Sequence, residues 1–505
     1  MKKVRSVAAA AVAAALLAAC SGGGSSTPSP VSTAPANTIV TPSISIVGVG
    51  DSLTAGYQSD GLLGVPVVPN PVAGSPFQPG VPATQENGWW ALLWSQANGG
   101  AAVGNAANSP LPLISGPGLG TVLVPNAALS PTAIVSGAGA TCAGLNALAY
   151  SYATALQTRA NPTTTPFDLG IPGQNVHEAY YQTGPEVPCS IPATATTQFA
   201  GLIALLGGGG GESGTFYPIL GNFLQGTTQV GAAASLHTKY ATVWLGSNDL
   251  LKFTFSLGTL PATSASAMQA DLVTIIRALQ GAGEKVAIAN LVTVLDAAYF
   301  VPQPALQTVL VQDATATATA SALAQGAPAG TAAAIGAAAG AQVATAYTAV
   351  VAPALLATYG VGSGGYVTIS GISKILTSLL TPGNPPYTLG GGDFVPDALA
   401  AQVSALNVAY NGSIAAAANQ TGAALVDVNT AFAQLVAHPG TTVPGQCCTM
   451  QFGGGFFSLD GIHPSNTGYA VLANLFIAQF NTSFGTTIPL VNVNTVFATD
   501  PFRPH

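Results

Sequence analysis

The sequence predicts an α/β fold built on a central, mostly parallel β-sheet. Short buried runs of strand-forming residues alternate with helical patterns along the chain. Several of these runs end in a polar turn, and ligands of an open parallel sheet bind outside the carboxyl ends of its strands. The 505 residues could hold one large domain or two to three ordinary ones.

Four segments define the first half of the predicted fold. A buried strand is expected over Ile44–Gly50, directly before the residues Gly-Asp-Ser-Leu. Trp89–Ala97 is expected to form a helix with an aromatic face, and Thr165–Gly173 a short strand and turn. Tyr240–Asp249 is predicted as a second buried strand that runs into a polar turn.

The second half continues the alternation. Strands are expected over Glu284–Val292 and Ala423–Asn429, with a helix around Ala398–Asn419 between them. Ser465 is a favoured N-cap for a final helix. Apolar residues follow it at helical spacing: Tyr469, Leu472 and Phe476.

We predict a single domain over residues 41–505, with long insertions around 62–140 and 310–395. The first insertion is rich in Pro and Gly and indicates surface loops around one helix. In the second, no charged residue occurs between Asp313 and Lys374, and Ala, Gly and Thr dominate. Ala-rich helices are the favoured interpretation; a mobile cover over an apolar site is the alternative.

The N-terminus has the pattern of a secretory signal. A basic start is followed by the apolar run Val7–Ala19, which is too short to span a bilayer. Leu17–Cys20 resembles a bacterial lipobox, in which lipidation of Cys20 would anchor the chain to a membrane; the alternative is an ordinary signal peptide with a chance Cys. We therefore expect a signal over 1–20, a Ser/Gly/Pro tether over 21–40, and a lipid-anchored cell-envelope protein, facing the periplasm or the surface at the outer membrane.

Composition excludes some functions. Only 5% of residues are charged and the net charge is −7, so no basic patch for nucleic acid is expected. No metal or other cofactor is expected, because no set of His, Cys and carboxylates has metal-ligand spacing. The four cysteines after the signal suggest disulfides: Cys142 with Cys189 is the pairing we favour, leaving Cys447 and Cys448 free or joined as neighbours.

Four polar blocks carry the functional prediction. Gly50–Leu53, Gly170–Gly173 and Gly246–Asp249 follow predicted strands, and Asp460–Pro464 lies near the C-terminus. Each block alone is a weak signal. All four in this order at the ends of strands indicate one site.

With these blocks the chain resembles the SGNH (GDSL) hydrolase family of esterases and lipases. The family's Ser, Gly, Asn and His blocks match Ser52, Gly173, Asn248 and His463, and Asp460 matches the acidic partner of the histidine. The resemblance implies a flavodoxin-like three-layer sandwich. It also implies hydrolysis of esters that range from short acyl esters to phospholipids and acetylated sugars.

The same residues suit ester cleavage on chemical grounds. A serine hydroxyl needs an adjacent base, which His463 can supply, and Asp460 can hold the His Nδ1–H. The N–H groups of Ser52 and Gly173 and the amide of Asn248 could form an oxyanion hole. Gly170 is the alternative to Gly173.

Each of these residues also has a structural interpretation. Ser52 could cap a helix, Asn248 could stabilise a turn, and Asp460 with His463 could be a structural polar pair. Four independent coincidences are improbable, so the hydrolase hypothesis is preferred.

Three other polar residues lie beside the blocks. His177 could line the cleft, but no acid other than Glu178, which points elsewhere, is expected near it. Asp51 and Asp249 are predicted to stabilise turns through local backbone, not to act as acids or bases.

The predicted substrate is a lipid-type carboxylic ester. The Trp89–Ala97 helix, Phe456 and Phe457 before the Asp/His block, and the uncharged insertion place apolar residues around the expected site, although core packing is the commoner role of aromatics. The alternatives are a carbohydrate O-acetylesterase, an acyltransferase, and a surface-anchored binding lipoprotein without activity. The oligomeric state is not predicted.

Overall fold

The computed structural model describes most of the chain beyond the N-terminal region. The described residues are 42–59, 61–64, 83–114, 119–120, 159–182, 220, 227–348, 356–381, 383, 387–443, 447–501 and 503. Cys20, Cys142 and Cys189 lie outside them, so the lipid anchor and the pairing of the last two remain predictions.

A four-stranded parallel sheet forms the centre of the molecule, in the order β1-β4-β5-β9. Its strands are β1 (Ile46–Gly50), β4 (Tyr240–Trp244), β5 (Lys285–Ala289) and β9 (Ala424–Val426). All but the first residue of β5 and the middle residue of β9 are buried, which explains why the sequence shows apolar runs instead of alternation.

The expected strand over Thr165–Gly173 is the exception. Only one isolated parallel bridge forms there, between Gly48 and Asp168. Three backbone hydrogen bonds nevertheless join the segment to β1: the Gly48 N–H donates to the Phe167 carbonyl, and the Leu169 and Ile171 N–H groups donate to the Gly48 and Gly50 carbonyls. The segment therefore lies along the outer edge of β1 without forming a regular strand.

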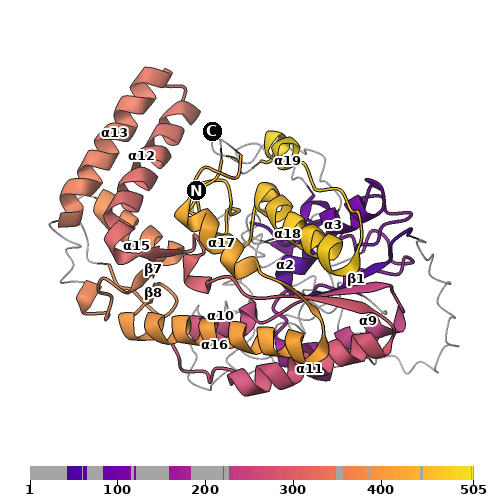
Figure 1. Ribbon diagram of the computed structural model, residues 1–505. Helices are drawn as coiled ribbons and strands as arrows, with labels where there is room; N and C mark the ends of the chain where they lie inside the picture. The colour runs from indigo at the N-terminus through magenta and orange to yellow at the C-terminus, as the bar shows by residue number, and fades with distance from the viewer. Residues whose placement is uncertain are drawn as a thin grey trace, which may run out of the picture.

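Helices cover both faces of the sheet and make the three-layer α/β sandwich (Figure 1). On one face lie α3 (Trp89–Ala97) and α18 (Asn466–Phe484). On the other lie α9 (Gln229–Ser235), α11 (Ala265–Gly281) and α16 (Asp397–Thr421). The predicted fold class is confirmed.

The face under α3 and α18 shows why these sequences form helices there. Ser465 caps α18 and accepts a hydrogen bond from the Gly468 N–H at 3.1 Å. The Phe476 ring of α18 stacks on Trp89 of α3 at 3.9 Å between ring centroids, and Trp89 meets Trp244 of β4 at 5.6 Å. The aromatic face of α3 is therefore core packing.

A second, smaller unit is inserted between β5 and α16. It contains a three-stranded antiparallel sheet of β6 (Phe300–Pro302), β7 (Tyr366–Thr368) and β8 (Phe394–Val395). Its helices are α12 (Leu306–Ala324), α13 (Ala329–Ala346) and α15 (Ile369–Leu380), and they enclose a hydrophobic cluster separate from the main core.

Helices α12 and α13 form a hairpin that projects from the body, called the arm below (Figure 1). The two helices pack closely because Gly336 and Gly340 face Thr319 and Thr315, where a Cβ atom would collide with the threonine side chains. The described part of the uncharged stretch after Asp313 is thus largely helical. No helix among the described residues is long and apolar enough to cross a membrane.

The remaining elements are short or connect the units. Cys447 and Cys448 form a disulfide between neighbours across a cis peptide bond, one of the two alternatives open from the sequence.

The other elements are α2 (Ser52–Ala55), β2 (Gly61–Leu62), η1 (Gln85–Asn87), β3 (Leu119–Gly120), α6 (Val176–Tyr181), α10 (Ser247–Phe255), η4 (Val294–Asp296), η5 (Gln303–Ala305), α17 (Val428–Ala437) and α19 (Val493–Thr499).

Candidate active site

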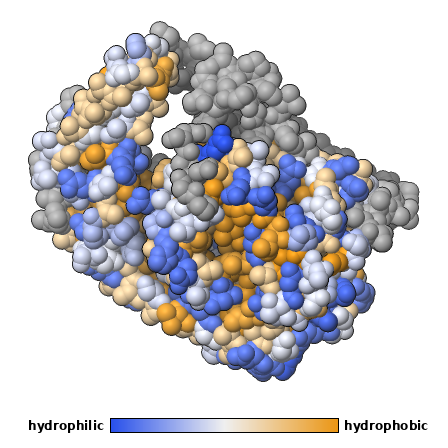
Figure 2. All heavy atoms as spheres, turned by 45° about the horizontal axis from the view of Figure 1, so that its top comes forward, coloured by the Kyte–Doolittle hydropathy of each residue, from blue (hydrophilic) through white to orange (hydrophobic). Residues whose placement is uncertain are grey.

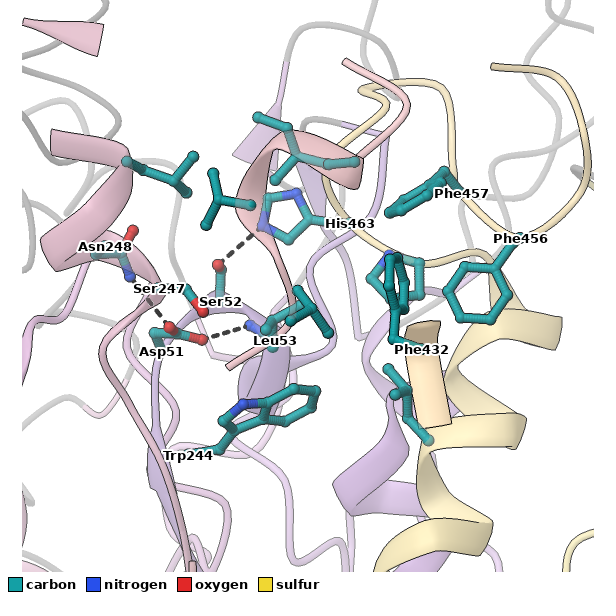
Figure 3. Close-up of a pocket in the computed structure, with 17 residues that line it drawn as sticks. Asp51, Ser52, Leu53, Trp244, Ser247, Asn248, Phe432, Phe456, Phe457 and His463 are labelled. Carbon is teal, nitrogen blue, oxygen red and sulfur yellow. Dashed lines mark hydrogen bonds between the residues drawn. The ribbon is translucent and has the colours of Figure 1, made fainter. Parts of the chain in front are cut away.

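Two of the polar blocks meet because β1 and β4 are adjacent parallel strands. Ser52 opens α2 two residues after β1, and Asn248 lies in the first turn of α10, four residues after β4. The carboxyl ends of the two strands lie at the same edge of the sheet, so both side chains reach one cleft (Figure 3).

A short loop brings the third block to the same edge. The Ser458 N–H donates to the His463 carbonyl at 2.8 Å, which closes the loop that carries Asp460. The Ser458 hydroxyl in turn accepts the Ser59 N–H at 2.8 Å. The loop is therefore tied to the segment that follows α2, and its position relative to Ser52 is fixed.

Ser52, His463 and Asp460 form a continuous hydrogen-bonded row. The His463 Nε2 atom lies 2.8 Å from the Ser52 Oγ atom, and the Nδ1 atom lies 2.9 Å from the Asp460 Oδ2 atom. The histidine and aspartate side chains are only 12% and 11% exposed, so water competes little for these bonds. This is the geometry of a nucleophile, its base and a group that orients the base.

The second carboxylate oxygen of Asp460 fixes the loop itself. The Oδ1 atom accepts the backbone N–H groups of Ile462 at 2.8 Å and His463 at 2.7 Å. With both oxygens engaged, the carboxylate has one orientation, and the imidazole is held between it and Ser52. The Tyr57 ring packs against His463 at 4.8 Å between ring centroids.

The structure distinguishes the two glycines proposed for the oxyanion hole. The Gly170 N–H donates to the Asp168 carboxylate at 2.9 Å, and a Cβ atom on Gly170 would collide with the backbone of Ala55. Gly173 has a φ of +80°, which favours glycine. Within the described part of the chain, the N–H groups of Ser52 and Gly173 have no acceptor.

Asn248 lies in the site, but its amide group is engaged. The Nδ2 atom is 3.2 Å from the Asp51 Oδ2 atom and 3.0 Å from the Gln174 carbonyl oxygen. An amide nitrogen carries two hydrogens, so both have acceptors in this state.

Asp51 has a role that the sequence did not indicate. Its Oδ1 atom accepts the Leu53 N–H at 3.0 Å, the expected local bond, while its Oδ2 atom accepts from Asn248 (Figure 3). Burial raises the pKa of Asp51 to about 7, although the Leu53 N–H and the nearby His463 lower it. The carboxyl therefore titrates near neutral pH.

An apolar cavity, called the inner pocket below, opens beside Ser52 and His463. Phe456 and Phe457 lie on one side of it together with Phe432 of α17, and Trp244 lies beneath the serine (Figure 3). Neither Lys nor Arg is among its described lining residues. These are Asp51, Ser52, Leu53, Trp244, Ser247, Asn248, Leu251, Val292, Val294, Ala297, Phe432, Phe456, Phe457, Ile462, His463, Pro464 and Leu472.

The apolar surroundings differ in part from expectation. Phe456 and Phe457 are buried and also line the inner pocket, so the two roles considered for them coincide. The Trp89–Ala97 helix does not line it. Trp244 and Phe432 do, although nothing in the sequence marked them as site residues.

Two expectations about neighbouring polar residues were wrong. His177 does have an acid beside it, since its Nδ1 atom lies 3.0 Å from the Asp271 Oδ2 atom of α11, and His177 is not among the lining residues of the inner pocket. Asp249 does not stabilise only its own turn: its carboxylate accepts from the Val176 N–H at 3.2 Å and from the Thr263 hydroxyl at 2.6 Å. Both partners are distant in sequence.

No cluster of three or more His, Cys, Asp or Glu residues suited to a metal occurs in the described ranges.

A family model described as GDSL-like Lipase/Acylhydrolase matches residues 46–476. The searches of curated proteins and of solved structures gave no significant match.

Proposed function

Because the chain belongs to the GDSL-like lipase/acylhydrolase family, whose members are esterase- and lipase-type hydrolases, we propose that it cleaves carboxylic esters with Ser52 as the nucleophile. The observation that carries this proposal is the row of hydrogen bonds from Ser52 through His463 to Asp460, at 2.8 Å and 2.9 Å.

The first half of the reaction forms an acyl-enzyme. His463 Nε2 takes the Ser52 proton while the Oγ atom bonds to the ester carbonyl carbon. The tetrahedral intermediate then collapses, the bond to the alkoxy oxygen breaks, and His463 returns the proton to the leaving alcohol. Asp460 holds Nδ1–H and stabilises the imidazolium that forms in between.

The second half of the reaction repeats these steps with water as the nucleophile. His463 takes a proton from a water molecule, whose oxygen attacks the acyl carbon, and the Ser52 Oγ atom leaves with that proton. The free Ser52 and Gly173 N–H groups are suited to hold the oxyanion in both halves. Asn248 adds a third donor once one of its amide hydrogens turns from Asp51 or Gln174 to the substrate.

The lining of the inner pocket supports an apolar acyl group as the substrate. Phe432, Phe456 and Phe457 form a wall of aromatic rings whose centroids lie 5.4–6.0 Å apart. Burying an apolar chain against such a surface is favourable by about 25 cal/mol per Å². A sugar ring would instead need several buried polar partners.

Hydrolysis of p-nitrophenyl butanoate by the purified protein tests the proposal. The wild type is expected to release p-nitrophenol, and Ser52→Ala is expected to reduce the rate by at least 10³-fold with the fold retained. Equal turnover by the two proteins would refute Ser52 as the nucleophile. Absence of hydrolysis by the wild type on esters of any chain length would refute the ester specificity.

A further inference from the structure

A second cavity lies between the arm and the body of the molecule, and we call it the outer groove. Figure 2 shows the arm standing away from the body with a hollow at its side. The groove has a volume of about 240 Å³. Its described lining residues are Leu295, Asp296, Ala297, Ala298, Phe300, Val301, Pro302, Ala305, Val309, Gln312, Asp313, Tyr366, Val436, Met450, Gln451 and Phe452.

Three separate elements form walls of both the inner pocket and the outer groove. Helix α17 presents Phe432 to the pocket and Val436, one turn later on the same face, to the groove. The loop after the Cys447–Cys448 disulfide presents Met450–Phe452 to the groove and Phe456 with Phe457 to the pocket.

The third shared element is the segment around η4. Val294 lines the inner pocket, Leu295 and Asp296 line the outer groove, and Ala297 lines both. Ala297, the residue that lines both cavities, has one of the smallest side chains. The two cavities are neighbours at Ala297, which lines both of them.

The outer groove has a lining that suits a neutral apolar chain. Two of its residues with large apolar side chains, Val436 and Phe452, are 42% and 38% exposed, so both are accessible to a ligand in the groove. Its charged residues are Asp296 and Asp313, and no Lys, Arg or His is among its described lining residues. An anionic group would meet only repulsion there.

We propose that the outer groove binds the distal part of a long, uncharged acyl chain whose ester group lies at Ser52. The inner pocket then holds the first carbons of the chain, and the chain passes Ala297 to reach the groove. This assignment rests on the proposed ester hydrolysis and adds the chain length and charge of the substrate. Val309 of the arm, Val436 and Phe452 would set the preference for long chains.

The test compares p-nitrophenyl dodecanoate with p-nitrophenyl butanoate, both below the concentration at which the longer ester forms micelles. Val436→Trp fills the groove from α17, and Val309→Trp fills it from the arm. Each is expected to lower kcat/KM for the dodecanoate by roughly tenfold or more while the butanoate value is kept, because only the long chain loses its contacts.

Val408→Trp is the matched control. Val408 is 74% exposed on α16 and lines neither cavity, so the same change in size should leave the ratio of the two kcat/KM values as in the wild type. Butanoate turnover also reports whether each variant is folded. If one tryptophan variant has no butanoate activity, the test relies on the other one, which fills the groove from the opposite wall.

A charged probe tests the uncharged nature of the chain. A dodecanoate ester with a carboxylate at its far end should be a poorer substrate than the plain dodecanoate, and Asp313→Asn should reduce that difference. The proposal is overturned if both tryptophan variants keep the wild-type ratio, or if the terminal carboxylate has no effect. Loss of all hydrolysis in the wild type would instead overturn the proposed function.

Discussion

The two halves of the candidate site differ in how complete they are before substrate arrives. In the half that activates the nucleophile, Ser52, His463 and Asp460 already hold one another at hydrogen-bonding distance. In the half that would stabilise the oxyanion, the N–H groups of Ser52 and Gly173 have no acceptor among the described residues, but both hydrogens of the Asn248 amide are taken by Asp51 and Gln174.

This difference has a physical reason. The hydrogen bonds of the nucleophilic half are needed in the resting state, since they set the tautomer of His463 and the direction of its lone pair. An amide buried without acceptors would cost about 1–3 kcal/mol, so Asn248 uses local acceptors until a stronger one, the oxyanion, replaces them. The exchange makes Asn248 more useful in the transition state than in the ground state.

The largest expected effect comes from breaking the complete half. His463→Ala removes the base and leaves Ser52 without an acceptor for its proton, so kcat for p-nitrophenyl butanoate should fall on the order of 10⁴-fold or more. Thermal unfolding of the variant checks that the fold is kept. A fall of less than tenfold would mean that another base serves Ser52.

A smaller effect is expected from the incomplete half. Asn248→Ala should lower kcat by about 10²–10³-fold with little change in KM, because the lost bond is made to the transition state. The split between the two constants is informative. If Asn248 only links Asp51 to Gln174, the variant should instead lose thermal stability while kcat stays within a few-fold of the wild type.

The sequence allowed most of the candidate site to be predicted, for reasons that are local. Ser52 and Asn248 follow apolar runs that could only be buried strands, and parallel strands place their ends together. Asp460 and His463 are three residues apart in one turn. Ser52 and His463 are 411 positions apart, and the order of the strands, which the alternation of patterns indicates, brings them together.

What the sequence did not indicate depends on tertiary contacts. The bond from Asp51 to Asn248 and the pair of His177 with Asp271 join residues 197 and 94 positions apart, without a motif. The segment Thr165–Gly173 is not a regular strand, although Phe167, Leu169 and Ile171 exchange backbone hydrogen bonds with β1.

The second unit was also hard to recognise in the sequence. Strands β6, β7 and β8 are two or three residues long, too short for a period of two to be recognised. The outer groove lies between this unit and the body, so its lining residues come from four separate stretches of chain. Composition alone showed that this insertion has few charged residues, but not which of its residues face a cavity.

The smallest expected effect on catalysis concerns the support of the Gly170–Gly173 turn. Asp168 is 1% exposed and accepts the Gly170 N–H, and burial raises its pKa to about 8. Asp168→Asn keeps an acceptor for that N–H but cannot ionise. We expect kcat within about threefold of the wild type, because the oxyanion donors keep their places.

Stability should nevertheless respond to the same change. The folded state binds a proton at Asp168 more tightly than the unfolded state, so this contribution is complete below about pH 4 and is lost as the pH rises to about 8. The slope can reach about 1.4 kcal/mol per pH unit for one such group. Urea unfolding at pH 5 and pH 8 should therefore show a smaller decrease for Asp168→Asn than for the wild type, with the variant the more stable of the two at pH 8. Equal decreases in the two proteins would show that Asp168 is ionised in the folded state, and the turn that carries Gly173 would then rest on a buried charge.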